Sequence, residues 1–170
     1  MPSPFVGVLD AHYFPDGSGA RAALVVADRW TAPAAYATFT AEADAAAPYV
    51  AGNLAARELP CLLAVLGRCF VDLGVLVVDG NAWNAPGVPG LGAQLWSARG
   101  QAAPVVGVAK SCLAGSSALP VQRGTSGRPL WVTAAGMDPE VAAARVAEMA
   151  GAHRLPRLIQ RADALARGRT

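Results

Sequence analysis

The sequence has little lysine, little cysteine and no long apolar run, and each shortage narrows the class of protein that it encodes. Lys110 is its single lysine, beside thirteen arginines in 170 residues. The three cysteines, Cys61, Cys69 and Cys112, have no zinc-binding spacing and are odd in number, so we expect a reducing, cytoplasmic compartment. No apolar stretch approaches the roughly 18–20 residues of a membrane span, and no signal-peptide pattern is present, so we expect no membrane partner.

What is abundant points to a globular protein. Hydrophobic residues make up 54% of the chain and charged residues 15%, which predicts a single folded domain over residues 1–170. Residues 1–60 carry three arginines and six acids, whereas residues 121–170 carry eight arginines and four acids. The acidic part suits a metal ion and the basic part suits phosphates; the alternative for each arginine is a solvated surface position.

Apolar runs and turn signals predict alternating strands and helices. We expect strands over residues 5–10, 20–27, 34–40, 74–79 and 105–109, and a hairpin from residues 119–123 and 129–133. We expect a short extended piece that ends at Arg57-Glu58, helices over residues 60–71, 91–98 and 138–150, a loop over 81–89, and a last helix after Pro156. This order predicts an α/β fold, a mixed sheet with helices on both faces.

Three of the expected strands end on charged side chains. The first ends on Asp10, a later apolar strand on Asp79, and the next on Lys110, while Glu58 lies at an expected helix entrance. The carboxyl ends of strands are where α/β sheets build active sites. Converging carboxylates repel one another unless a cation lies among them, and oxygen ligands suit Mg²⁺ or Mn²⁺. The alternative is that Asp79-Gly80 is a strand-ending turn and Asp10 a loop residue.

Two further residues stand near these positions. A lysine in an arginine-rich chain indicates a site that requires a compact ammonium rather than a planar guanidinium, which makes Lys110 a candidate catalytic residue. His12 follows Asp10 by two residues, so it shares a face with Asp10 if the strand continues. The alternative for His12 is a partly exposed position at the strand end.

Several short motifs, in order along the chain, resemble those of the endonuclease V family of enzymes, which act on nucleic acids with deaminated bases. The motifs are residues 7–13 (GVLDAHY), 48–52 (PYVAG), 57–58 (RE), 78–80 (VDG), 107–111 (GVAKS), 129–132 (PLWV) and 154–156 (RLP). Residues 107–111 are the same as a motif of that family, and the resemblance runs from about residue 6 to about residue 166. It implies a ribonuclease H-like fold.

The resemblance also implies roles for individual residues. Asp10, Glu58 and Asp79 would hold Mg²⁺, or Mn²⁺, and Lys110 would approach the scissile phosphate. The expected substrate is DNA or RNA that contains inosine (hypoxanthine), cut by a monomer to leave 5′-phosphate and 3′-hydroxyl ends. The residues expected to bind the nucleic acid are Tyr49, Arg57, Gly80, Asn81, Ser111 and Arg154.

Departures from the family pattern leave other functions open. Ala85 and Met137 stand where the family has histidines, which the resemblance implies would be near the metal ions and the recognition pocket. Ala51 replaces a proline in the segment with Tyr49. A catalytically weak or inactive nucleic-acid-binding relative is therefore an alternative, as is a nuclease with another substrate. For the binding protein, the expected phosphate contacts are Arg123, Arg128, Arg154, Arg157 and Arg161.

Overall fold

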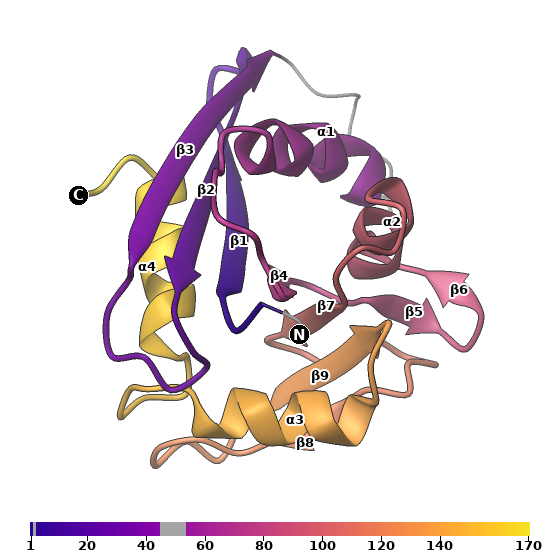
Figure 1. The fold of residues 1–170 in the computed structure, drawn as a ribbon. Coiled ribbons are helices and arrows are strands. Elements are labelled where there is room, and N and C mark those ends of the chain that lie inside the picture. The colour runs from indigo at the N-terminus through magenta and orange to yellow at the C-terminus, as the bar shows by residue number, and fades with distance from the viewer. Residues whose placement is uncertain (2, 45–53) are drawn as a thin grey trace.

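The structure, a computed structural model, describes residues 1, 3–44 and 54–170, with backbone only for residues 54–56. The described residues form a seven-stranded mixed sheet, a separate two-stranded sheet and four helices (Figure 1). The strands of the large sheet are β1 (Val6–Tyr13), β2 (Gly19–Ala27), β3 (Ala37–Asp44), β4 (Val75–Asp79), β7 (Val105–Ala109), β8 (Leu119–Val121) and β9 (Leu130–Ala135). The helices are α1 (Leu54–Leu66), α2 (Leu91–Ala98), α3 (Pro139–Glu148) and α4 (Arg157–Ala166).

The centre of the large sheet is parallel and its margins are antiparallel. The strand order is β3-β2-β1-β4-β7-β9-β8. Strands β1, β4 and β7 run parallel, whereas the β1–β2, β2–β3, β7–β9 and β8–β9 pairs are antiparallel. Strands β4 and β7 are almost entirely buried, as expected for parallel strands covered on both faces.

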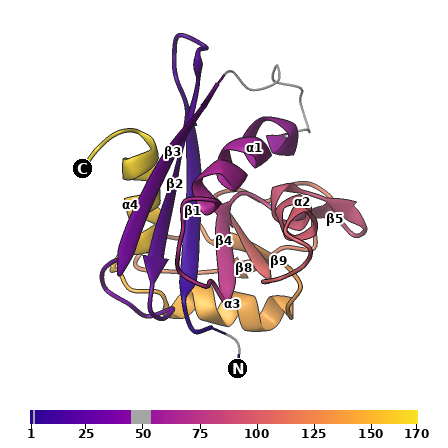
Figure 2. The same ribbon diagram turned by 45° about the horizontal axis from the view of Figure 1, so that its top comes forward.

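Helices cover both faces of the sheet, which confirms the predicted architecture (Figures 1 and 2). Alternate residues of β1 separate the two layers: Val6 and Val8 pack in one apolar core with residues of α3 and α4, such as Val146 and Leu158. Leu9 packs in the other core, which includes residues of α1 and α2. In the part of the chain that is described, no helix is long and apolar enough to span a membrane.

Helix α1 differs from its prediction. It begins at Leu54 and ends at Leu66, so Arg57 and Glu58 are helical rather than extended, and Pro60 lies inside the helix instead of in its first turn. Proline removes one backbone donor and is costly inside a helix. Burial of Cys61, Leu62 and Val65 on the sheet supports the helix through this point, because tertiary packing can override local propensity.

Two other elements extend beyond their predicted bounds. Strand β1 continues past Asp10 to Tyr13, because β2 pairs with it over its whole length while β4 pairs only as far as Leu9. The predicted loop over residues 81–89 contains a small two-stranded sheet, β5 (Trp83–Ala85) and β6 (Val88–Pro89). The predicted hairpin of β8 and β9 is confirmed, although β8 ends at Val121.

Candidate active site

The strand register brings three charged residues to one edge of the sheet. Leu9 of β1 is opposite Val78 of β4, so Asp10 and Asp79 follow at the same level on neighbouring strands. Strand β7 is the next neighbour of β4, and Lys110 is the first residue after it. The prediction that these three side chains gather at the strand ends is therefore confirmed by the topology, with Asp10 lying within β1 where its pairing with β4 ends.

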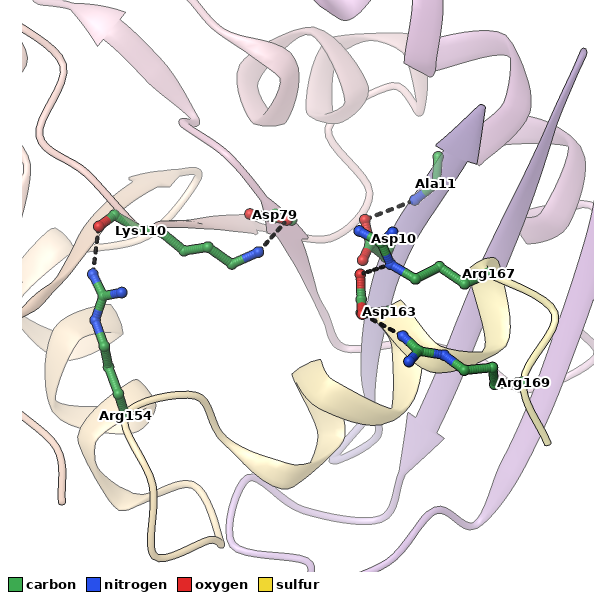
Figure 3. Close-up of polar contacts among 8 residues, drawn as sticks. All are labelled: Asp10, Ala11, Asp79, Lys110, Arg154, Asp163, Arg167 and Arg169. Carbon is green, nitrogen blue, oxygen red and sulfur yellow. Dashed lines mark hydrogen bonds and ion pairs between the residues drawn. The ribbon is translucent and has the colours of Figure 1, made fainter. Parts of the chain in front are cut away.

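A cavity of about 440 Å³ lies at this edge, between the strand ends and α4. Its charged lining consists of Asp10, Asp79, Lys110, Asp163 and Arg169. Figure 3 shows Asp163 projecting from α4 toward Asp10, with Lys110 reaching from β7 toward Asp79. Carboxylates from three separate elements thus face one space together with two cations.

The ammonium of Lys110 is paired with a carboxylate of this cavity. Lys110 Nζ lies 3.4 Å from Asp79 Oδ2, and both side chains are partly exposed. The backbone of the same residue is held by Arg154, whose Nη2 donates to the Lys110 carbonyl. Arg154 also donates to the carbonyls of Arg128 and Pro129, each at 2.9 Å. We expected the Arg154 guanidinium to contact nucleic acid. It instead donates to backbone carbonyls, and its bond to the Lys110 carbonyl holds the backbone of Lys110 in place.

Burial and neighbouring charge perturb the acid on β1. Burial raises the pKa of Asp10, the charge of Asp79 raises it further, and the result is a pKa of about 7 against an ordinary 3.8. Asp163 adds to this rise, whereas the backbone N–H of Ala11, which donates to Asp10 Oδ1 at 2.8 Å, and the charge of Lys110 lower the pKa. The ionised form of Asp10 is therefore disfavoured, because one backbone N–H and one lysine do not offset its burial and its acidic neighbours.

The acid on α1 belongs to the same electrostatic cluster. Burial raises the pKa of Glu58 to about 7, with further contributions from the charges of Asp10 and Asp79, while Arg57 lowers it. Although Glu58 is outside the residues that line the cavity, these effects connect it to both strand acids. A cation among the carboxylates would offset both the burial and the repulsion that raise these two pKa values.

The donor set fits a hard divalent cation in its chemistry. Asp10, Glu58, Asp79 and Asp163 offer carboxylate oxygens, the ligands that Mg²⁺ and Mn²⁺ prefer. Within the described ranges, no three His, Cys, Asp or Glu side chains are already drawn together closely enough to hold a metal ion. Asp79 is instead directed at Lys110, and Asp163 at arginines.

Sequence reasoning missed Asp163. It is the single acid after Glu148 in the sequence, and it is on a helix whose apolar residues, among them Leu158 and Ala162, pack on the sheet. Helix α4 packs against β1 and β2, which brings Asp163 next to Asp10. The sequence does show that Asp163 is a lone acid beside the buried residues of an amphipathic helix, which could have marked it as a site residue. That it lies near Asp10 depends on the tertiary packing.

The residues expected to surround a nucleic acid lie on loops that leave these strands. Gly80 and Asn81 follow β4 in a loop that crosses Gly107 of β7. A side chain at Gly107 would meet the backbone N of Ala82 at 2.4 Å, so this close crossing requires glycine there. The Asn81 Oδ1 is buried and has no hydrogen-bond partner among the described residues, which is uncommon for a buried polar atom. Ser111 is exposed directly after Lys110.

Arg57 is beside an aromatic ring at the end of β1. Its guanidinium carbon is 3.8 Å from the centroid of the Tyr13 ring, in a cation–π contact. The pKa of Tyr13 is raised, first by burial and then by the charge of Glu58. Tyr49 and the segment 48–52 lie outside the described residues, so the role expected for Tyr49 stays a prediction.

The expected phosphate contact at Arg123 is wrong. The residue is only 6% exposed, and its guanidinium donates to the backbone carbonyls of the residues that end α3 and precede α4. These acceptors are Val146, Ala147, Met149, Gly151 and Arg154, at 2.8–3.2 Å. Arg123 thus serves as a buried cap for this turn, a role that the sequence pattern did not reveal.

The two positions that lack histidines are in different places. Met137 follows β9 at the end where β7 begins, and it lines a cavity with Gly74 and Val75 at the opposite end of the strands from Asp79. The expectation that a histidine at this position would be near the carboxylates is therefore wrong. Ala85, in β5, lines a separate cavity of about 250 Å³ with Trp83 and other residues.

His12 is on the same face of β1 as Asp10, since the strand continues through both residues. It is half-buried and opposite Arg21 of β2. The three cysteines are free: Cys61 is buried, Cys69 is half-buried and Cys112 is exposed.

Comparisons with known proteins identify a family that this chain resembles. A family model described as endonuclease V matches residues 2–137. An endonuclease V of Xanthomonas oryzae pv. oryzae (strain PXO99A) is 35% identical over 111 residues, which is 65% of this chain and 46% of that protein. The chain therefore spans about half the length of the curated relatives it matches.

Solved structures show the same fold. The endonuclease V of Streptomyces avermitilis superposes with a TM-score of 0.83 at 30% identity, covering 98% of this chain and 82% of that chain. An endonuclease V of Ciona intestinalis, solved in complex with DNA containing an inosine followed by a ribo-adenosine, has a TM-score of 0.78 at 21% identity and covers 97% of this chain and 85% of that one. With a family model that covers most of the sequence, the chain belongs to the endonuclease V family.

Proposed function

We propose that this protein is a divalent-metal-dependent endonuclease that hydrolyses phosphodiesters near deaminated bases, such as inosine, in DNA or RNA. The observation that carries the proposal is the cavity at the strand ends, where Asp10, Asp79 and Asp163 face Lys110. Electrostatic contacts connect Glu58 to the same carboxylates. Membership of the endonuclease V family supports this chemistry and this class of substrate.

The carboxylates would hold Mg²⁺ or Mn²⁺. When bound, such an ion supplies activation of a water molecule and neutralisation of phosphate charge. Asp10 and Asp79, side by side on adjacent strands, would bind the ion from the sheet. Glu58 would bind it from α1 and Asp163 from α4, so the site is built by elements on both faces of the sheet.

Lys110 would stabilise the charge that develops on the phosphate. Its ammonium lines the cavity and would exchange Asp79 for a phosphate oxygen at little cost, because a partly exposed ion pair of this length is weak. Arg154 holds the Lys110 carbonyl and thereby fixes the point from which the side chain reaches. Positioned cations of this kind act electrostatically in phosphoryl chemistry.

Loops around the cavity would bind the nucleic acid. Gly80, Asn81 and Ser111 follow the strands that carry Asp79 and precede Lys110, which supports the proposal that they would contact a phosphate bound there. The unpartnered Asn81 Oδ1 would accept a hydrogen bond from a base. As expected from the sequence, Tyr49 would stack where the base is displaced, and Arg57 would contact the nucleic-acid strand.

The experiment that tests this function is a cleavage assay with matched substrates. Short DNA and RNA duplexes with a single inosine are compared with unmodified duplexes, in Mg²⁺, in Mn²⁺ and with a chelator. We expect cutting near inosine that requires the metal and leaves 5′-phosphate ends. Equal cutting of unmodified duplexes would instead indicate a nuclease with another specificity.

A catalytically weak or inactive nucleic-acid-binding protein is the second candidate, favoured by Ala85 in place of a family histidine. On that account, binding to inosine-containing duplexes persists without cleavage. We predict that Ala85→His raises Mg²⁺-dependent cleavage, while Met137→His, at the other end of the strands, does not. The measured quantity is the single-turnover rate, and equal effects of both substitutions would count against a role for position 85.

A further inference from the structure

The end of α4 turns the chain back toward the acidic cavity. Gly168 has φ +79°, in the left-handed region that favours glycine. Its N–H donates to the Leu165 carbonyl at 3.0 Å, and the N–H of Arg169 donates to the Ala164 carbonyl at 2.8 Å. This pair of bonds is the Schellman motif that ends many helices. The motif fixes the backbone of Arg169 beside the last turn of the helix.

Both carboxylate oxygens of Asp163 are consequently bound by arginines. Arg167 Nε donates to Oδ1 at 2.8 Å, and Arg169 Nη2 donates to Oδ2 at 3.4 Å (Figure 3). These oxygens are the atoms that a divalent cation at the site would use. An incoming cation therefore competes with the two guanidinium groups for Asp163.

The two arginines differ in what they can do once released. Arg167 is four residues after Asp163 on the same helix, a spacing that commonly produces an ion pair on a helix surface. Arg169 lies beyond the helix and lines the cavity with Asp10, Asp79 and Lys110. Its side chain is 65% exposed, so it can change partner without unfolding any buried structure.

On the basis of the proposed function, we propose that Arg169 is a phosphate-binding residue of the active site, held by Asp163 until a divalent cation takes that carboxylate. The released guanidinium would then line the cavity together with Lys110, so two cations would face a phosphate that binds there. Arginine suits this role because its planar fork binds phosphate oxygens in pairs. Lys110 and Arg169 would contact the phosphate from β7 and from the end of α4 respectively.

The exchange predicts effects of opposite sign on two ligands. Removing Arg169 removes a competitor for Asp163, so the cation should bind more tightly. The same change removes a phosphate contact, so the nucleic acid should bind more weakly. A residue that merely satisfies a helix end would produce neither effect.

The test measures both affinities for Arg169→Gln, with Arg145→Gln as the control. Arg145 is an exposed arginine that is also paired with an acid, Glu148 at 3.2 Å, but it is on α3 and away from this cavity. Mn²⁺ binding is titrated by electron paramagnetic resonance without nucleic acid. Binding of a short inosine-containing DNA duplex is measured in Ca²⁺, with a gel to confirm that the DNA stays intact.

We expect Arg169→Gln to bind Mn²⁺ about twofold to fivefold more tightly, as befits the loss of an exposed ion pair. We expect its DNA affinity to fall about fivefold to tenfold, with a salt dependence reduced by about one phosphate contact. Arg169→Lys should recover part of the DNA affinity. Unchanged or weaker Mn²⁺ binding, or DNA binding equal to that of Arg145→Gln, would overturn the proposal. Neither readout needs cleavage, so a failed nuclease assay would be a separate result.

Discussion

At the scale of single residues, the site combines acids that repel one another with cations that are loosely held. Asp79 has the Lys110 ammonium 3.4 Å away, while Asp10 and Glu58 have raised pKa values because they are buried near other carboxylates. Such perturbed groups in a cavity are typical of functional sites. Lys110 is the residue whose type is most informative, because every other basic side chain of the Lys/Arg kind in this chain is an arginine.

We therefore predict that Lys110→Arg is not neutral. The larger planar group cannot occupy the place of the ammonium between Asp79 and the phosphate, so kcat should fall by about tenfold or more. The melting temperature should change little, because the side chain is exposed. Single-turnover cleavage and thermal unfolding check this, with Arg145→Lys as the control. A rate equal to that of the unsubstituted protein would mean that the site accepts any cation.

At the scale of elements, two arginines support the segment behind Lys110. Arg123 donates to five backbone carbonyls around the turn between α3 and α4, one of which belongs to Arg154. Arg154 in turn donates to the Lys110 carbonyl. Side-chain donors thus hold both the turn between α3 and α4 and the backbone of Lys110 directly after β7.

We predict that Arg123→Met destabilises the fold. It leaves several carbonyls in a buried setting without a donor, and each such loss costs about 1–3 kcal/mol, so the total should reach roughly 3 kcal/mol or more. Urea unfolding measures the effect, and the exposed Arg68→Met should change stability by about 0.5 kcal/mol or less. If Arg123→Met instead has the unfolding free energy of the unsubstituted protein but binds nucleic acid poorly, Arg123 would have to be reinstated as a phosphate contact.

The sequence could predict the buried parallel strands better than the start of α1. The runs over residues 75–78 and 105–109 are apolar and buried, and a charged residue directly follows each, so the positions of these strands were readable. The start of α1 was not, because Pro60 signals a first turn while the helix is held by packing further along. Asp163 and the capping role of Arg123 were missed for a related reason. Asp10, near Asp163, and the carbonyls that Arg123 binds belong to other parts of the fold, and only the tertiary packing brings these groups together.

At the scale of the whole molecule, the sheet holds the acids near one another at a cost in stability. The ordinary pKa of Asp10 is 3.8 and that of Glu58 is 4.5, and both are raised to about 7 in the folded state. Between these values the folded protein binds more protons than the unfolded chain. The free energy of unfolding should therefore fall as pH rises from about 4 to about 7, and level off above that range.

This predicts that the metal-free protein is less stable at about pH 8 than at about pH 5, and that Asp10→Asn reduces the difference. Mg²⁺ or Mn²⁺ should stabilise the protein at the higher pH, since it binds the ionised folded form. Denaturant unfolding in a chelator, with and without excess cation, measures each effect. Asp72→Asn, a change at an exposed acid that precedes β4 and so lies at the opposite end of that strand from Asp79, is the control. An Asp10→Asn protein with the pH dependence of the unsubstituted chain would contradict the clustering of the acids.

The central claim is that the strand-end carboxylates perform metal-dependent cleavage, and Asp79→Ala tests it most directly. The rate of inosine-directed cleavage is measured at matched Mg²⁺ for the unsubstituted protein, for Asp79→Ala and for the control Asp72→Ala. Circular dichroism establishes that all three are folded. We predict a loss of about 100-fold or more for Asp79→Ala and no change for Asp72→Ala, because a lost metal ligand removes water activation and phosphate neutralisation together. A folded Asp79→Ala protein that cleaves at the unsubstituted rate would contradict the account.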